Sequence, residues 1–251
     1  VGLPEGLVAE EVAVIDPASY GSWVRLAVDP KGRLIAAPHE RNALMRMVVP
    51  APGQEGEPQI EVLTRSFGQA QGLCFVGDDL WVSVNGSDHR SPGVYRLTYR
   101  AEADRYNRPE LLLPIDSKTS EHGPHALVRS PDGKQVYFLA GNYTPLPESL
   151  ADRYVAEEAV RGRWGAALPP PGGGGARARG GYVLRTDPKG EAWTLYAAGL
   201  RNPYDLVFHA QGGLFTVDSD TEADAGLPWY RPTRLVEVLP GGDFGWRSGN
   251  G

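Results

Sequence analysis

Residues 126–141 read ALVRSPDGKQVYFLAG, and this stretch decides the fold. A short apolar run leads to the turn residues Pro131, Asp132 and Gly133, and a second run rich in aromatic and β-branched residues follows. Tight hairpin turns favour Gly and Asp, because these residues accept the backbone conformations that such turns need. The stretch therefore predicts two antiparallel strands joined by a tight turn.

The same strand–turn–strand pattern occurs three more times in the chain. The other copies are RLAVDPKGRLIAA at 25–37, GLCFVGDDLWVSV at 72–84 and DLVFHAQGGLFTVDS at 205–219. Further strand-like runs lie between the copies, at 43–50, 93–99, 181–187, 191–198 and 234–240. Four-stranded units that recur at roughly 40–50 residues are typical of a β-propeller. We therefore expect an all-β fold of this kind.

One insertion stretches the last repeat, from about Tyr143 to Gly180. It holds SLADRYVAEEAVRG at 149–162, the one run that predicts a helix, and then LPPPGGGGARARGG at 168–181. The second run is too rich in Pro and Gly to pack a core and is expected to form a loop. Since long loops in compact domains often carry function, the insertion is either a surface excursion or a lid over the central pocket.

The repeats indicate a single domain over residues 1–251, with 143–180 as an insertion loop within it. A closed propeller of this size usually has more than four units. The chain also stops at GWRSGNG, a turn that should lead into another strand. We therefore expect a propeller that is truncated at its carboxyl end.

Composition and charge argue against several classes of function. The 251 residues include 32 Gly and 22 Pro, about a fifth of the chain, which is high for a helical protein. The formal net charge of -6 argues against nucleic acid as a partner, because its phosphates require a basic surface. No apolar run approaches the roughly 20 residues of a membrane span.

Cys74 is the only cysteine and lies in the apolar run GLCFV, so we expect a buried, unreactive thiol.

Two histidines, His122 and His125, directly precede the strand that opens the hairpin at 126–141. Imidazole titrates near neutral pH, so a histidine at the mouth of a propeller channel could accept a proton. The segment contains Gly and Pro and is not helical, so the spacing brings the two rings together without fixing a metal geometry. The alternative is that both histidines are structural.

An Arg–Asn–Pro corner, Arg201 to Pro203, precedes the last hairpin. The guanidinium of Arg201 is permanently charged and suits a carboxylate or a polarised carbonyl oxygen, and Asn202 adds a donor and an acceptor. The alternative is a strand-entry turn in which the Asn side chain caps backbone groups. That alternative explains Asn-Pro better than it explains Arg.

Four carboxylates alternate along DSDTEAD, at Asp218, Asp220, Glu222 and Asp224. In an extended segment the alternation would place all four on one side, where they repel one another unless a cation joins them. Hard oxygen ligands favour Ca²⁺, although the segment is not an EF-hand. The alternative is a solvated acidic loop.

An aromatic and basic corner follows the acidic run, at Trp229, Tyr230 and Arg231 in GLPWYRPTRL. A second one, GDFGWRSG, contains Phe244 and Trp246. Core packing is the default for such residues, and stacking of a planar ring against them is the functional alternative.

These motifs resemble those of the soluble PQQ-dependent glucose/sorbosone (aldose sugar) dehydrogenases, which are six-bladed β-propellers. The resemblance rests on HGPHALVRSPDGK from His122 and GLRNPYDLVF from Gly199. It is stronger to the propeller module of large secreted bacterial proteins of the membrane-bound dehydrogenase type, which are often joined to haem-binding cytochrome c domains. The runs that carry this second resemblance are WGAALP, GGYVLRTD, FTVDSD, PWYRPTR and FGWRSGNG.

The resemblance implies an oxidoreductase that uses PQQ to oxidise a sugar or polyol, with a cytochrome c domain as a possible electron acceptor and a periplasmic or extracellular location. It places His122 at the general base, and Arg201 and Asn202 at the pair that contacts the quinone oxygens. Gln71 is a looser match to a cofactor-contacting glutamine. The run from Asp218 to Asp224 falls in the loop that holds structural Ca²⁺, and His125 replaces a family glycine.

Two other functions stay open on these residues. The first is a propeller without catalytic activity that binds carbohydrate or protein inside a larger secreted assembly, which the altered calcium loop favours. The second is a hydrolase of the lactonase type with a central Ca²⁺. That interpretation needs acidic ligands from several repeats, and the early repeats offer few besides Glu40, Asp78 and Asp79.

Overall fold

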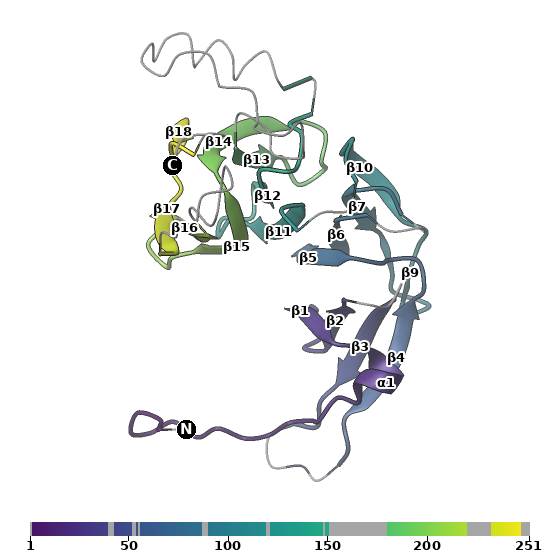
Figure 1. Cartoon of the computed structure of the whole chain (residues 1–251). Helices are drawn as coiled ribbons and strands as arrows, with labels where there is room; N and C mark the ends of the chain where they lie inside the picture. Colours follow the sequence, from purple (N-terminus) through teal and green to yellow (C-terminus); the bar gives the residue numbers. More distant parts are fainter. Residues whose placement is uncertain are drawn as a thin grey trace.

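A computed structural model describes the greater part of the chain. The described residues are 2–39, 43–51, 54, 56–86, 90–118, 121–147, 149–150, 180–219 and 232–246. Four antiparallel sheets dominate it and stand in an arc around one centre (Figure 1). This is the arrangement of a β-propeller, so the predicted fold class is confirmed.

Each predicted hairpin forms the first two strands of one sheet. The first sheet holds β1 (Trp23–Val28), β2 (Leu34–Pro38), β3 (Leu44–Val48) and β4 (Gln59–Thr64). The second holds β5 (Ala70–Val76), β6 (Asp79–Val84), β7 (Gly93–Leu97) and β10 (Glu110–Pro114). The third holds β11 (Pro124–Arg129), β12 (Val136–Ala140), β13 (Gly181–Thr186) and β14 (Thr194–Leu200). The fourth holds β15 (Asn202–Phe208), β16 (Leu214–Ser219) and β17 (Arg234–Glu237).

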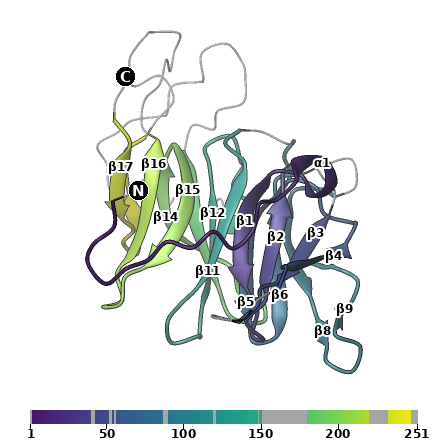
Figure 2. The same cartoon turned by 90° about the horizontal axis from the view of Figure 1, so that it is seen from below.

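A short helix, a small hairpin and one short strand complete the described fold. A one-turn helix α1 (Pro17–Tyr20) precedes β1, and the strands β8 (Tyr99–Arg100) and β9 (Arg105–Tyr106) form a hairpin between β7 and β10. In the side view α1 and this hairpin lie at opposite ends of the sheets (Figure 2). The short strand β18 (Gly242–Asp243) pairs in parallel with β14 and so extends the third sheet rather than the fourth.

Side chains that point alternately to the two faces of the middle strands fill the spaces between neighbouring sheets. On β12, Phe138 faces a core cluster with Trp81 of the second sheet, whereas Tyr137 faces a cluster with Leu206 of the fourth. On β6, Leu80 is buried in the cluster that reaches the first sheet. These two strands are apolar on both faces because the second and third sheets each have a neighbouring sheet on either side. The sheets therefore pack face to face like blades.

The inner strands of the four sheets lie next to one another around the centre, in the order β1, β5, β11, β15. Their closest approach is at Gly72 on β5, where a Cβ atom would lie 2.4 Å from the His125 carbonyl oxygen and 2.9 Å from the Leu127 nitrogen. Both obstacles are backbone atoms, so a side chain at this position cannot be accommodated by a change of rotamer. Glycine is required here by space.

The predicted insertion is only partly described. Residues 151–179 lie outside the described residues, and with them most of the expected helix and the Pro/Gly-rich run. At its start, Thr144 is buried at 1% exposure, and Leu150 belongs to the core cluster that contains Phe138. The described beginning of the segment thus packs into the fold, and the choice between excursion and lid stays open.

We predict that Gly72→Ala destabilises the chain by about 2 kcal/mol or more, because β5 and β11 must separate to admit the methyl group. Urea unfolding followed by circular dichroism measures this change. Gly56→Ala is the matched control, since its Cβ would meet only a Pro50 side-chain atom at 3.5 Å. Equal stability of the two variants would contradict the close approach.

Candidate functional site

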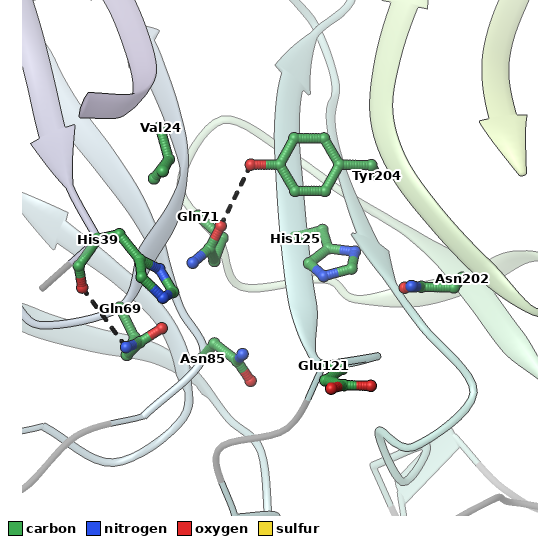
Figure 3. Close-up of a pocket in the computed structure, with 9 residues that line it drawn as sticks. All are labelled: Val24, His39, Gln69, Gln71, Asn85, Glu121, His125, Asn202 and Tyr204. Atoms are coloured by element: carbon green, nitrogen blue, oxygen red, sulfur yellow. Dashed lines mark hydrogen bonds between the residues drawn. The ribbon is translucent and has the colours of Figure 1, made fainter. Parts of the chain in front are cut away.

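A cavity of about 700 Å³ opens at the centre of the arc, at the end where the inner strands begin. All four sheets contribute to its wall (Figure 3). The lining residues are Val24, His39, Gln69, Gln71, Asn85, Glu121, His125, Asn202 and Tyr204. Most of these side chains are polar and uncharged, and the described lining contains no Lys or Arg. A concave site with several converging polar groups is the usual form of a small-molecule site.

Each inner strand has a β-bulge at the position that faces this cavity. The pairing register shifts around Val24 in β1, around Gln71 in β5, between Pro124 and Leu127 in β11 and between Pro203 and Leu206 in β15. A bulge breaks the strict alternation of side chains and re-aims one of them. The four repeats therefore turn their equivalent residues, Val24, Gln71, His125 and Tyr204, into the same cavity.

Hydrogen bonds tie the second sheet to the first and the fourth across the cavity. The Tyr204 hydroxyl donates to Gln71 Oε1 at 3.4 Å, and Gln69 Nε2 donates to the His39 carbonyl oxygen at 3.4 Å. Gln69 has a φ of 54°, in the left-handed region. Strained backbone of this kind clusters at binding sites.

His125 is the predicted pocket residue that the structure places most clearly in the cavity wall. The residue is 3% exposed, and Nδ1 lies 2.7 Å from the Pro203 carbonyl oxygen, to which it must donate. The Tyr204 ring lies 5.2 Å away in a tilted arrangement. Burial lowers the pKa of His125 below its usual range, although backbone carbonyl oxygens of Pro203 and Glu121 oppose this. We therefore expect a neutral imidazole at pH 7.

His122, the predicted general base, is not among the described residues that line this cavity. It is 6% exposed, its Nδ1 is 2.5 Å from Asn142 Oδ1, and its ring stacks on Tyr143 at 4.2 Å and 19°. An amide oxygen can only accept, so this contact holds a proton on Nδ1 and leaves the lone pair on Nε2. The position fits a base whose orientation is fixed.

Arg201 and Asn202 are joined to Asp218 through their backbones. Both N–H groups of the pair donate to the Asp218 carboxylate, at 3.1 and 2.9 Å to Oδ1, and Arg234 Nη2 adds an ion pair at 3.1 Å to Oδ2. Burial raises the pKa of Asp218, and these donors act in the opposite direction. The Arg201 side chain is 5% exposed and donates to Ser219 Oγ at 3.2 Å. Asn202 reaches the cavity, and its Oδ1 is buried without a hydrogen-bond partner among the described residues.

The expected calcium run is described only at its first member. Asp218 is fully buried, and its carboxylate is occupied by the donors named above, so it is bound to the strand entry at Arg201. Asp220, Glu222 and Asp224 lie outside the described residues, as do Trp229, Tyr230 and Arg231. Within the described part of the chain, no group of three or more His, Cys, Asp or Glu side chains could hold a metal ion.

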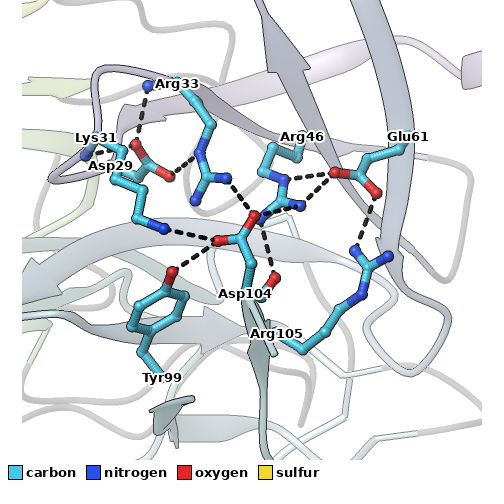
Figure 4. Close-up of polar contacts among 8 residues, drawn as sticks. All are labelled: Asp29, Lys31, Arg33, Arg46, Glu61, Tyr99, Asp104 and Arg105. Carbon is cyan, nitrogen blue, oxygen red and sulfur yellow. Dashed lines mark hydrogen bonds and ion pairs between the residues drawn. The ribbon is translucent and has the colours of Figure 1, made fainter. Parts of the chain in front are cut away.

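A second polar cluster joins the first sheet to the β8–β9 hairpin (Figure 4). Asp104 accepts from Arg33 Nη1 at 2.6 Å, from the Tyr99 hydroxyl at 2.6 Å and from Lys31 Nζ at 3.1 Å. Arg46 lies 3.2 Å from the same carboxylate and also pairs with Glu61. Arg33, with Tyr99 and Lys31, holds the pKa of Asp104 well below its usual range. The cluster lies away from the cavity and is a structural clamp.

The remaining sequence expectations concern the thiol and a membrane span. Cys74 is 7% exposed, which confirms that the thiol is buried, and burial raises its pKa to about 11. None of the helices in the described residues has the length and apolar character needed to cross a membrane.

Comparisons with known proteins find similar structures but no similar sequences. No family model and no curated protein sequence matches the chain. The PQQ-bound aldose sugar dehydrogenase of Streptomyces coelicolor aligns with 92% of this chain at a TM-score of 0.60 and 16% identity. A Thermus thermophilus protein described as an oxidoreductase (glucose dehydrogenase) aligns with 92% at 0.60 and 19% identity. The PQQ domain of pyranose dehydrogenase from Coprinopsis cinerea aligns with 88% at 0.57 and 10% identity.

This chain spans 64% of the Streptomyces protein, 67% of the Thermus protein and 51% of the Coprinopsis domain. At such identities the likeness shows a shared propeller fold. The structural neighbours of this fold include PQQ-dependent sugar dehydrogenases, so the expected resemblance is confirmed at the level of the fold. The finer resemblance to a multidomain secreted module stays a prediction.

We predict that the stability of the chain falls between pH 7 and pH 5 in a way that depends on His125. Because burial lowers the pKa of His125, the unfolded chain, with an ordinary pKa of about 6.5, binds the proton more readily than the folded one. Stability is then complete above this unfolded value and is lost as the pH falls below it. Urea unfolding of His125→Gln should show a shallower pH dependence, by up to one proton. The exposed His209→Gln serves as control and should retain the parent slope.

We predict that Asp104→Asn lowers the free energy of unfolding by about 1 kcal/mol at pH 7, the upper end for exposed ion pairs. Asn tolerates the left-handed backbone of residue 104 (φ 49°), so the loss reports the charge. Since the pKa of Asp104 is lowered, its contribution is present above about pH 4 and is lost as the pH falls. Glu102→Gln, in the same turn and paired with Arg100, is the control. A difference that persists unchanged at pH 2.5 would refute the electrostatic origin.

Proposed function

We propose that this chain forms the core of an oxidoreductase that oxidises a hydroxyl group of a sugar or polyol with a bound quinone cofactor. The observation that carries this proposal is the convergence of four bulged inner strands on one polar cavity of about 700 Å³. The volume lies within the usual range of small-molecule sites. The similarity of the fold to PQQ-bound sugar dehydrogenases supports the choice of cofactor.

The described cavity fits the quinone part of PQQ better than its carboxylates. Gln71, Asn202 and Tyr204 offer amide and hydroxyl groups for the ring carbonyl oxygens, and the buried Asn202 side chain has an oxygen with no described hydrogen-bond partner. The carboxylates of PQQ require cationic partners, which the described lining does not include. When bound, the quinone would supply the redox chemistry by accepting hydride from the substrate carbon.

The chain's own residues would position substrate and cofactor and move one proton. His122, with its Nδ1 bonded to Asn142, would take the hydroxyl proton at Nε2. Arg201 would stabilise negative charge that develops on the quinone oxygens, as a preorganised cation does. Gln71 and Asn202 would hold the quinone in register, and the buried, uncharged His125 would form part of the substrate wall.

We still propose a Ca²⁺ site at the acidic run, but with fewer of its carboxylates as ligands. Asp220, Glu222 and Asp224 retain the oxygen chemistry that Ca²⁺ prefers. Asp218 is less suited, because its carboxylate already accepts two backbone N–H groups and pairs with Arg234. We propose Trp229, Tyr230 and Arg231 as residues of the substrate pocket, on the sequence alone.

The wider organisation is likewise proposed. Residues 1–251 would form one propeller domain of the six-bladed type, with 143–180 inserted, and further blades would complete the ring. The four described sheets and the 64% coverage of the Streptomyces protein support this. We propose a periplasmic or extracellular location and a cytochrome c domain as electron acceptor, both on the sequence resemblance.

A second candidate is a binding module without catalytic activity. Two observations favour it: His122 lies outside the described lining of the cavity, and that lining has no cation for the PQQ carboxylates. Such a pocket of amides, imidazoles, a hydroxyl and the Glu121 carboxylate would still bind the hydroxyl groups of a neutral carbohydrate. The lactonase alternative gains no support from the described residues, which hold no metal-binding cluster.

We predict that the full-length protein, loaded with PQQ and Ca²⁺, oxidises at least one member of a sugar and polyol panel in a dye-linked assay. His122→Ala should lower turnover by about 10²–10⁴-fold, the usual contribution of a general base. Arg201→Lys should lower turnover as well, because it loses the planar fork. His209→Gln, exposed and distant from the cavity, is the control.

Calorimetry with PQQ and with the same sugars separates the two candidates. Quinone uptake together with turnover that depends on His122 supports the oxidoreductase. Sugar binding without quinone uptake would reject it in favour of the binding module.

A further inference from the structure

We propose that Asn142 is a positioning residue that fixes the proton of His122 on Nδ1 and joins His122 to Arg201. Asn142 is 1% exposed and lies just after β12, at the junction of the third and fourth sheets. Its side-chain oxygen lies 2.5 Å from His122 Nδ1, and its backbone N–H donates to the Arg201 carbonyl oxygen at 2.8 Å. Asn142 thus contacts the ring of His122 and the backbone of Arg201, the two residues to which the proposed function assigns a role in proton transfer and charge stabilisation.

The segment Gly141–Thr144, GNYT, holds the backbone of His122 as well as its ring. The Gly141 N–H donates to the Gly123 carbonyl oxygen at 2.9 Å, and the Tyr143 N–H and Thr144 hydroxyl donate to the His122 carbonyl oxygen at 3.3 and 3.1 Å. A Cβ at Gly141 would lie 2.7 Å from that same oxygen. The ring is therefore fixed by contacts on its backbone, its Nδ1 edge and, through the Tyr143 stack, its face.

The chemistry of the amide gives this contact a consequence for proton transfer. A neutral imidazole carries one proton, and the nitrogen that bonds an acceptor must carry it. With the Asn142 oxygen on Nδ1, the lone pair is on Nε2. If the amide were turned by 180°, its NH₂ group would force the opposite tautomer, and Nε2 could no longer accept a proton. Asn142 thereby selects which nitrogen can act as the base.

A carboxylate at the same position would act differently. Aspartate would also select the Nδ1–H form, but its charge would stabilise the protonated ring. The uncharged amide fixes the tautomer without adding that stabilisation. Asn142 thus fixes which nitrogen carries the proton without placing a charge next to the ring.

The test is ¹⁵N NMR of the histidine rings in the full chain, which has five histidines, with His122 assigned by comparison with His122→Gln. Above pH 7 the parent should show the Nδ1–H form of His122. Asn142→Leu should shift it to a mixture or to the Nε2–H form, whereas Asn142→Asp should retain Nδ1–H. Thr144→Val is the control, since it removes the hydroxyl bond to the His122 carbonyl oxygen and leaves the ring contact in place.

An Nε2–H form in the parent would overturn the proposal, and so would an unchanged tautomer in Asn142→Leu. If Asn142→Leu does not fold, the parent and Asn142→Asp spectra still decide: loss of the Nδ1–H form in either overturns it. The inference rests on the proposed function for its catalytic meaning, but the NMR readout does not require turnover. Absence of sugar oxidation in the parent, with the Nδ1–H form present, would reject the oxidoreductase and leave the positioning role intact.

Discussion

The contact on which the described fold depends is the backbone approach of β5 to β11. At Gly72 the two inner strands come so close that there is no room for a Cβ between them. Inner strands in a propeller must meet near the axis, where the blades have the least space. Because these strands are in contact, their first residues also lie together, and the cavity with residues from four sheets is a result of that packing. The position of the candidate site at the centre is thus a consequence of how the blades meet.

Most of this fold can be predicted from the sequence, because the hairpins depend on residues that are close together in the chain. Each predicted hairpin is present because its turn has a residue for the required backbone, such as Gly32, Gly133 and Gly212 with φ values of 79°, 73° and 99°. The strands β4 and β10 are absent from the predicted set. Both are partly exposed, and β10 reads ELLLP, which does not alternate. The pair β8–β9 is too short for a period to be recognised, and β18 depends on a parallel partner about 45 residues earlier, which no local pattern predicts.

The candidate site was predicted less completely, for a physical reason. Gln71, His125 and Asn202 do meet in one cavity, as expected for polar residues at the starts of inner strands. His39, Gln69 and Asn85 also line it but were missed, since they lie in loops after or before a strand and carry no motif of their own. The bulges that aim the four equivalent residues are set by strand pairing and not by composition. His39 and Asn85 share a sequence position from which a place in the cavity could have been predicted. Each follows the second strand of its hairpin, as Asn142 follows β12.

The largest difference between motif and structure is the separation of the two histidines. Spacing alone brought His122 and His125 into one neighbourhood, yet only His125 is in the described cavity wall, while His122 is turned toward Asn142 and Tyr143. Gly123 lies between the two histidines, against the second sheet. A Cβ there would lie 1.8 Å from Asn85 Oδ1, so the chain between the histidines passes directly against a lining residue of the second sheet. The two rings then take different environments: one is neutral by burial, and the other is held by an amide. A site that needs both a polar wall and an oriented base would require this division, and neither environment can be inferred from the letters HGPH alone.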